Sequence, residues 1–492
     1  MFNWKRVITM DGERVPSGID GLDQLIEGGF PRGSLIILAG NPGTGKTVFS
    51  MQFLCRGAKE YGDNGIYVSF AESEAILFNN MSKLFGCDLR AASNGKVKVL
   101  DFSTVTEKGL STVLEMIIEE ITKLKAKRLV IDSFSAMAQA FKDPIETRSL
   151  LHNILGKMIR HLGCTTLLIV EVPTGSDRIG ISIEEFVADG VVFLKKDTIE
   201  DRLIREIEIK KLRGTRLQRQ KFLFTLHAGF KIFPPFQTKN VEKPPPFEAV
   251  KGTKTHYSSG IPELDEILGG QGYARGSAVL YEIGENVLLD ALFAILLPTI
   301  ANFLIRDRGV MIVPPIGYGP DDIKEKIISF VDEEKFERNT RVATFPNPFV
   351  NGGNSNIILW KDPTVEKLDP VQNFNFYIEN AVKLSNELGK NLLHILCADN
   401  ITFLVYGESA LTSSAIGRSV IANKLAKDLM IYIAMPSFPS VTKILADVLH
   451  FYFKIEEKDG AMILYGKKPK TIIYVIEEDL SRGCRVRLTP IV

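Results

Sequence analysis

The chain has 492 residues and a formal net charge of +1, with 45% hydrophobic and 24% charged residues. This composition supports a large buried core and excludes a globally disordered chain. The near-neutral charge argues against a protein that binds nucleic acid or membrane surfaces through its overall charge. Its five cysteines are widely spaced and form no CxxC pair, which is typical of reduced thiols in a cytoplasmic protein.

Two segments of the chain share a motif and lie about one domain length apart. Residues 17–34 read SGIDGLDQLIEGGFPRGS, and residues 259–277 read SGIPELDEILGGQGYARGS. An apolar strand is expected directly after each copy, at 35–39 and at 278–283. This spacing indicates that a whole domain has been duplicated.

A proline-rich segment separates the two copies. Pro244, Pro245 and Pro246 lie within residues 233–256, and three consecutive prolines favour an extended spacer. We therefore predict a first domain at 1–236, a linker at 237–252 and a second domain at 253–492. The longest apolar stretch, 287–305, contains Asp290 and Pro298, and we expect it to form a buried helix instead of a membrane span.

The first domain alternates strand patterns with helix patterns. Strands rich in Val, Ile and Leu are expected at 35–39, 65–70, 97–101, 128–132 and 165–171, and helices at 47–61 and 110–125. Continuous apolar strands that alternate with helices predict an α/β domain whose mainly parallel sheet is covered on both faces.

Residues 40–47 read GNPGTGKT and match the G-x-x-x-x-G-K-[ST] phosphate loop, between an apolar strand and a helix. Glycines allow backbone N–H groups to turn toward phosphates, and the following helix directs its positive end at them. Lys46 is expected to contact the β- and γ-phosphates, and Thr47 to bind Mg²⁺. We predict that ATP is bound by Gly40, Asn41, Pro42, Gly43, Thr44, Gly45, Lys46 and Thr47.

Three carboxylates follow the strands of the same domain. Asp132, at the end of RLVIDS, is predicted to hold Mg²⁺ with Thr47, although an aspartate that only caps a turn fits the same pattern. Glu72, in YVSFAESE, is predicted to orient and deprotonate the attacking water, with Glu74 as the alternative. Glu171 ends another strand and is predicted to sense the γ-phosphate.

Together these motifs resemble the KaiC/RadA branch of the RecA-like ATPases, and within it the KaiC-like proteins. The resemblance is carried by SGIDGLDQLIEGGFPRGS, GNPGTGKT, YVSFAE, RLVIDS, TTLLIVE, FVADGVVFL and KKLRGT, all within residues 17–215. It implies tandem RecA-like P-loop NTPase domains in a ring, usually hexameric, with ATP between subunits. It also implies that Lys211 and Arg213 of the KLRGT segment reach the neighbour's γ-phosphate, whereas their spacing alone indicates a basic surface turn.

The sequence departs from this family in two places. Ala71 stands where catalytic members commonly carry the first of two adjacent glutamates, so one carboxylate remains. In the second copy the loop region reads IGENVLLDA at 283–291, and Gly284 is the only remnant of the phosphate loop. Pro314 and Pro315 follow the strand that would deliver the base, and no KLRGT segment follows. We therefore expect the second domain to be a degenerate pseudo-ATPase.

The leading functional prediction is an ATP-hydrolysing ring with a regulatory or signalling role and a protein partner that the sequence does not identify. One alternative is a non-catalytic ATP-binding scaffold, which Ala71 and the degenerate second half suggest. Another is a recombinase-like, DNA-dependent ATPase, against which the near-neutral charge stands. Autophosphorylation on Ser or Thr is left open, with no acceptor residue identified.

Overall fold

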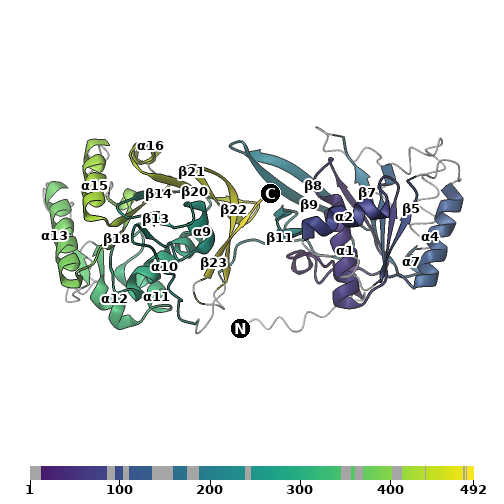
Figure 1. The fold of residues 1–492 in the computed structure, drawn as a ribbon, viewed down its shortest axis with the longest axis horizontal. Coiled ribbons are helices and arrows are strands. Elements are labelled where there is room, and N and C mark those ends of the chain that lie inside the picture. Colours follow the sequence, from purple (N-terminus) through teal and green to yellow (C-terminus); the bar gives the residue numbers. More distant parts are fainter. Residues whose placement is uncertain are drawn as a thin grey trace. The chain divides into compact units, whose positions relative to one another are not determined.

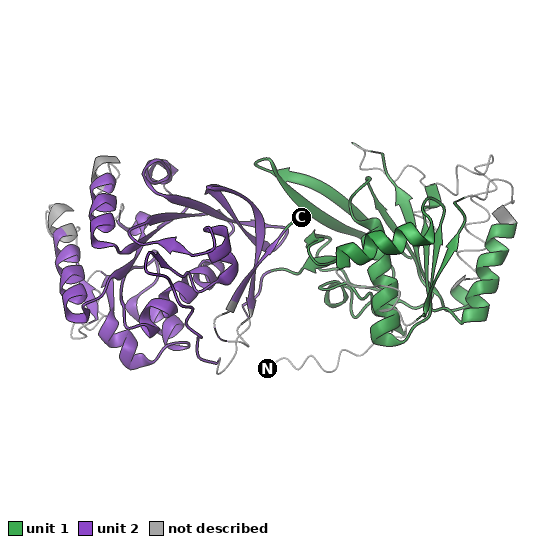
Figure 2. Cartoon of the chain, in the orientation of Figure 1, with its two compact units in different colours: residues 1–235, 491–492 green, residues 236–490 purple. Residues whose placement is uncertain are grey.

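The computed structural model describes residues 13–85, 95–103, 110–135, 159–173, 175, 188–238, 245–344, 356–360, 370–401, 413–437, 439–479, 483 and 485–492. The chain divides into two compact units, shown in Figure 2. Unit 1 contains residues 1–235 and 491–492, and unit 2 contains residues 236–490. Across the described residues, none of the helices combines the length and the apolar character needed to cross a membrane.

Unit 1 is built on a nine-stranded sheet with the order β11-β10-β9-β8-β3-β7-β6-β4-β5. All pairings from β5 to β8 are parallel, and those from β8 to β11 are antiparallel. The strands are β3 (Leu35–Gly40), β4 (Gly65–Ser69), β5 (Val97–Asp101), β6 (Arg128–Asp132), β7 (Thr165–Glu171), β8 (Gly190–Ile199), β9 (Arg202–Leu212), β10 (Lys221–Thr225) and β11 (Lys231–Phe233). The predicted mainly parallel α/β architecture is confirmed.

Helices cover both faces of this sheet, as Figure 1 shows for α1 and α2 on one face and α4 on the other. Side chains of a strand alternate between faces, so Ile36 and Leu38 of β3 join one apolar cluster while Ile37 joins the other. The helices and short elements are η1 (Asp23–Leu25), α1 (Lys46–Tyr61), α2 (Glu74–Phe85), α4 (Leu110–Leu124) and α7 (Ile159–His161), with a two-stranded ribbon of β1 (Arg14–Val15) and β2 (Phe30–Pro31).

Unit 2 has a ten-stranded sheet with the order β17-β16-β15-β18-β19-β14-β20-β21-β22-β23. Its strands are β14 (Ala278–Ile283), β15 (Gly309–Val313), β16 (Thr340–Thr344), β17 (Ile357–Leu359), β18 (Leu392–Cys397), β19 (Leu429–Ala434), β20 (Phe451–Lys458), β21 (Ala461–Lys468), β22 (Lys470–Asp479) and β23 (Arg485–Pro490). Its other elements are α9 (Pro262–Ile267), α10 (Leu289–Ile305), α11 (Pro320–Ile328), α12 (Glu333–Asn339), α13 (Pro370–Leu388), α14 (Ala398–Ile401), α15 (Ser413–Ala426), α16 (Pro439–Val448) and the ribbon of β12 (His256–Tyr257) and β13 (Tyr273–Ala274).

The two sheets have the same topology. If β14 is placed on β3, the strands β19, β18, β15 and β16 fall on β7, β6, β4 and β5, and β20 to β23 fall on β8 to β11. Only β17 has no counterpart among the described strands of unit 1. The repeat found in the sequence is therefore a repeat of the whole fold, and both units are RecA-like α/β domains.

The repeated motif has the same structural role in each unit. In unit 1 the Ser17 N–H donates to Asp23 Oδ1 (2.8 Å), and in unit 2 the Ser259 N–H donates to Asp265 Oδ1 (2.7 Å). Ser17 and Ser259 Oγ each accept the N–H two residues further on, at 3.1 Å. The shared serine and aspartate thus fix the turn that leads into each sheet.

Candidate active site

The phosphate loop of unit 1 connects β3 to α1 at the carboxyl edge of the parallel strands. Gly43 and Gly45 have φ values of 72° and 104°, a region that favours glycine. Gly45 directly precedes α1, and no side chain caps this helix end. The first N–H groups of α1 therefore remain without a side-chain acceptor, as an anion-binding helix terminus requires.

Lys46 is the first residue of α1 and only 7% of its surface is exposed. Its Nζ donates to the carbonyl oxygens of Gly40 (2.9 Å) and Asn41 (3.0 Å). Burial lowers the pKa of the Lys46 ammonium, while Glu171 and Asp132 oppose this shift. The lysine is thus held at the loop, in range of two carboxylates.

Thr47 and Asp132 come together at the same edge, with 3.4 Å between Thr47 Oγ1 and Asp132 Oδ2. The Tyr67 hydroxyl donates to the same carboxylate oxygen. Burial raises the pKa of Asp132, a hydrogen bond from Tyr67 and the charge of Lys46 oppose it, and Glu171 and Glu72 add to it. A hydroxyl and a carboxylate surrounded by further negative charge form an oxygen donor set that fits Mg²⁺.

The other two predicted carboxylates lie at the ends of neighbouring strands. Glu72 follows β4 in a turn in which Ser69 Oγ accepts the Glu72 N–H (3.1 Å) and donates to the Glu72 carbonyl (2.6 Å). Its side chain is exposed, and within the described chain it makes no hydrogen bond. Glu171 ends β7, where its N–H donates to Ser135 Oγ (3.0 Å) and its side chain is exposed. Both act electrostatically on Asp132, so they belong to the same edge.

Lys211 and Arg213 do not join this group within one chain. Gly40 pairs with Leu194 on β8, whereas Lys211 pairs with Val191 nearer the other end of that strand. Lys211 Nζ donates to the Ala188 carbonyl (2.8 Å), and Arg213 Nη1 lies 3.7 Å from Asp189 Oδ1. The register thus places both cations toward the sheet edge opposite the loop, and their action on a neighbouring subunit remains a prediction.

Three residues of this edge carry no motif signal. Tyr67 lies in β4 and reaches Asp132 because alternate residues of a strand share a face. Arg205 Nη1 donates to the Gly43 carbonyl (3.3 Å), and a Cβ atom on Gly43 would lie 2.8 Å from Lys196 Nζ. The Arg205 and Lys196 contacts depend on the pairing of β8 with β9 and β3, and the Tyr67 contact depends on the pairing of β4 with β6. The sequence pattern specifies none of these pairings.

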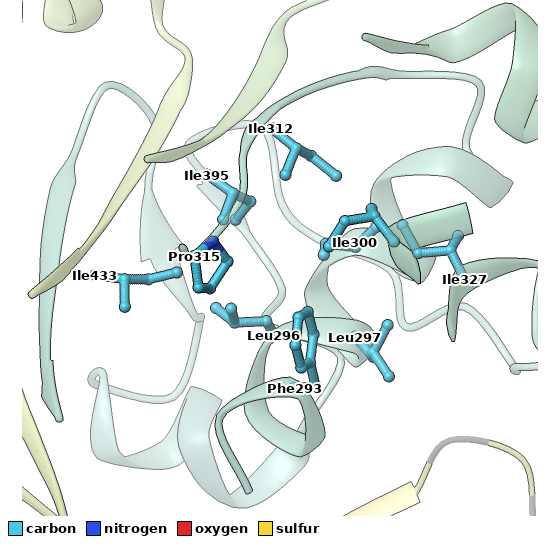
Figure 3. A pocket seen from close by; sticks show the side chains of 10 residues that line it. Phe293, Leu296, Leu297, Ile300, Ile312, Pro315, Ile327, Ile395 and Ile433 are labelled. Carbon is cyan, nitrogen blue, oxygen red and sulfur yellow. The ribbon is translucent and has the colours of Figure 1, made fainter. Parts of the chain in front are cut away.

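In unit 2 the helix that follows β14, α10, begins with Leu289 and Asp290 in place of a lysine and a threonine. Between α10 and the neighbouring strands is a cavity lined only by apolar side chains, shown in Figure 3. Its lining residues are Phe293, Leu296, Leu297, Ile300, Ile312, Pro315, Ile323, Ile327, Ile395 and Ile433.

The strand position equivalent to Asp132 is Leu396 when traced from β15, or Cys397 when traced from β14. Asp399 lies beyond either position, in α14, where it accepts the Met435 N–H at 2.6 Å.

Comparison with known proteins identifies the family. Residues 15–235 match the model of the KaiC ATPase family. The chain belongs to the KaiC-like proteins. Within unit 2, residues 246–349 match a different model, described as GvpD basic region 2. The KaiC ATPase domain is therefore followed by a second domain that has diverged from it in sequence while keeping its strand order.

Individual relatives agree with this assignment. The circadian clock oscillator protein KaiC of Parasynechococcus marenigrum (strain WH8102) is 33% identical over 281 residues, which are 55% of this chain and 53% of that protein. The corresponding protein of Parathermosynechococcus lividus is 34% identical over 277 residues, 54% and 49% of the two chains. This chain thus spans about half the length of these curated relatives. The solved structure of a KaiC-like protein from Pyrococcus horikoshii OT3 is 37% identical in sequence, with a TM-score of 0.41. The match covers 46% of this chain and 100% of that protein.

Proposed function

We propose that unit 1 binds Mg²⁺-ATP on residues 40–47 and hydrolyses it. The observation that carries this proposal is the meeting of Lys46, Thr47 and Asp132 at one sheet edge, with 3.4 Å between Thr47 Oγ1 and Asp132 Oδ2. These are the three parts that hold a nucleoside triphosphate and its metal in P-loop ATPases. The loop N–H groups and the N-terminus of α1 supply the remaining donors.

Each residue has a definite part in this proposal. Lys46 leaves the carbonyls of Gly40 and Asn41 and binds the β- and γ-phosphates. Thr47 and Asp132 hold Mg²⁺, which neutralises charge on the phosphate oxygens. Glu72 orients the attacking water and accepts its proton, because an exposed carboxylate at the end of β4 is free to meet a solvent molecule. Glu171 contacts the γ-phosphate from β7.

The site is completed by a neighbouring subunit. The loop edge supplies a cradle, a metal site and a base, and the cations of the KLRGT segment lie toward the opposite edge of their own sheet. In a ring, Lys211 and Arg213 would stabilise the charge that spreads over the γ-phosphate oxygens in the transition state. We infer a homo-oligomeric ring, hexameric as the family resemblance implies, in which unit 2 completes the assembly or binds a regulatory protein.

A non-catalytic scaffold is the second candidate. The observation that favours it is Ala71, which leaves Glu72 without an acidic neighbour directly before it. The two functions differ in one measurable property, because a scaffold binds ATP without releasing phosphate.

Phosphate release by the purified protein, measured for wild type and Glu72→Gln, tests the proposal. Loss of a general base costs about 10²–10⁴ in rate, so Glu72→Gln should retain ATP binding and lose turnover. Glu74→Gln is the matched control, since Glu74 is also exposed and lies in the first turn of α2. Wild-type turnover in Glu72→Gln removes Glu72 from the mechanism. Tight ATP binding with no turnover in the wild type favours the scaffold.

A further inference from the structure

Two cations that the mechanism above does not use meet at the apex of the phosphate loop. Lys196 on β8 and Arg205 on β9 are directly paired across the β8–β9 hairpin. Directly opposed residues of an antiparallel pair project from the same face of the sheet. Gly40 pairs with Leu194, two residues before Lys196, so the hairpin continues past the start of the loop.

Arg205 supports the loop from its carbonyl side. It is 9% exposed, and its Nη1 donates to the Gly43 carbonyl (3.3 Å). Its Nε donates to a main-chain oxygen of Val492 (2.5 Å). Burial lowers the pKa of this guanidinium. A buried cation is costly to desolvate, and the hydrogen bond to the Gly43 carbonyl is one of the contacts that offset this cost.

The hydrogen bond from Arg205 to the Gly43 carbonyl also affects the orientation of the next N–H group in the phosphate loop. The C=O and N–H of a trans peptide point in opposite directions. By binding the Gly43 carbonyl, Arg205 fixes the Thr44 N–H of the same peptide in the opposite direction, where it makes a long hydrogen bond to the Asn41 carbonyl (3.4 Å). An inward-directed N–H is what a phosphate loop offers to its ligand.

Lys196 lies where the side chain of a larger residue at position 43 would point. Its Nζ would be 2.8 Å from a Cβ atom on Gly43, and the side chain is exposed. Within the described residues it has no ion pair, and its charge contributes to the lowered pKa of Lys46. Lys195, the next residue along β8, differs because its Nζ lies 3.6 Å from Glu208 Oε2. Two ammonium groups that repel each other beside a glycine loop form a site for a polyanion.

We propose that Lys196 binds the phosphates of the nucleotide held by its own subunit, and that Arg205 positions the loop through the Gly43 carbonyl. The inference rests on the proposed function, because it needs a nucleotide at residues 40–47. It adds a cation supplied within the subunit to those expected from the neighbour. The hairpin, and not the loop motif alone, then determines nucleotide affinity.

The experiment measures the equilibrium dissociation constant of a fluorescent ATP analogue with Mg²⁺ for wild type, Lys196→Gln, Lys196→Arg and Lys195→Gln. One charge-assisted hydrogen bond corresponds to about a tenfold change in Kd, so Lys196→Gln should bind about tenfold more weakly. Lys196→Arg should stay near wild type, and Lys195→Gln should be unchanged because its side chain pairs with Glu208. High salt should narrow the difference between wild type and Lys196→Gln.

The possible outcomes test the role of Lys196 separately from nucleotide binding by unit 1. If the wild type binds the analogue, Lys46→Ala does not, and Lys196→Gln equals wild type, the proposed function stands and the Lys196 inference is wrong. Equal weakening by Lys196→Gln and Lys195→Gln also overturns it, because it would show a general charge effect. If the wild type itself fails to bind, the proposed function fails and this inference falls with it.

Arg205 is tested by comparing Arg205→Gln with Arg205→Lys. Weaker nucleotide binding in Arg205→Gln, with partial recovery in Arg205→Lys, is expected from a residue that positions the loop. The melting temperature of the nucleotide-free protein is measured in parallel. If Arg205→Gln lowers that temperature and leaves Kd unchanged, Arg205 is only structural.

Discussion

The two units of the chain share an architecture and differ at one sheet edge. Both begin with the same serine and aspartate turn, with Ser17 and Ser259 making bonds of nearly equal length. Both then order their sheets in the same way. After β3 comes a glycine loop with a lysine, and after β14 come residues 284–288, which lack both. A domain can therefore keep the residues that determine its fold while it lacks the residues that bind phosphate.

The helices after these loops show what replaced the site in unit 2. α1 begins with Lys46 and Thr47, which face the loop and Asp132. α10 begins at Leu289 and is buried almost continuously from Ala291 to Leu304. Beyond its first two residues α1 is also largely buried, so the contrast between the units lies at the first turn of the helix, where unit 1 has Lys46 and Thr47 and unit 2 has Leu289 and Asp290. Four predictions test this contrast between the two units.

The largest expected effect is on nucleotide stoichiometry. We expect about one ATP per wild-type chain and none in Lys46→Ala, because that variant removes the cation that we propose binds the β- and γ-phosphates. Asn286→Ala is the matched control, since Asn286 is exposed in the equivalent connection of unit 2. Equilibrium dialysis with labelled ATP gives the ratio. Two ATP per chain, with one lost on mutating residues 284–290, would show that unit 2 has kept a nucleotide site.

The second prediction concerns the neighbouring subunit. A cation supplied in trans can be worth about 10³–10⁵ in rate, so Lys211→Ala/Arg213→Ala rings should be nearly inactive. Mixing them with Lys46→Ala subunits should restore part of the activity, because some interfaces then pair an intact cradle with intact cations. Subunit exchange is verified independently by fluorescence energy transfer. Exchange without recovered phosphate release, or full turnover by a monomer, contradicts the in-trans arrangement.

The fold of unit 1 could be predicted because the residues that indicate its strands and helices are close together in the sequence. The strands of unit 1 are continuous runs of Val, Ile and Leu, and the phosphate loop lies between a strand and a helix within a few residues. The repeated motif predicted a second domain of the same class, and the strand orders agree.

The site residues that could not be predicted from the sequence are brought together by pairing between distant strands. Nothing near Lys196 or Arg205 marks them, and only the register of β8 against β9 and β3 brings them to Gly43. Tyr67 is likewise found only through the pairing of β4 with β6. The register assigns the position equivalent to Asp132 to Leu396 or Cys397, and Asp399 lies beyond both, in α14. A shift of one residue changes the face to which a side chain points, and pattern alone does not fix it.

The third prediction concerns a buried ion pair that only unit 1 has at this place. Arg128 is fully buried, and its Nε donates to Asp63 Oδ2 (3.0 Å). In the matching register of unit 2 this position is Leu392, also buried. Arg128→Leu should destabilise the protein by about 3 kcal/mol, because it leaves a buried carboxylate without its main partner. Adding Asp63→Asn should restore part of that loss.

Lys127→Ala is the control for this pair. Lys127 Nζ lies 3.0 Å from Asp63 Oδ1, but half of its side chain is exposed, and a surface ion pair contributes about 0–1 kcal/mol. Urea unfolding followed by circular dichroism measures each variant. An equal loss from Lys127→Ala and Arg128→Leu would mean that burial of Arg128 has no special energetic part.

The smallest effect is expected at Asp399, which is 1% exposed and accepts the Met435 N–H. Burial raises the pKa of Asp399 to about 6. An unfolded aspartate has a pKa of about 3.9, so between these values the folded chain holds a proton that the unfolded chain has lost. The free energy of unfolding therefore falls as the pH rises from about 4 through about 6. This contribution is fully present below pH 4.

Asp399→Asn removes that dependence, because an amide stays neutral and its oxygen can still accept the Met435 N–H. At pH 7.5 the pKa difference between the folded and unfolded states corresponds to a cost of roughly 3 kcal/mol in wild type, which the variant avoids. Burial of the amide nitrogen without a partner offsets part of this gain, so the variant should be more stable than wild type by roughly 1–2 kcal/mol. At pH 4 the advantage should disappear. ATP binding should not change, whereas Asp132→Asn in unit 1 should weaken Mg²⁺-dependent ATP binding. If Asp399→Asn and Asp132→Asn impair nucleotide binding equally, then Asp399 in unit 2 also takes part in binding. The proposed difference between the two units, with nucleotide binding confined to unit 1, would then be wrong.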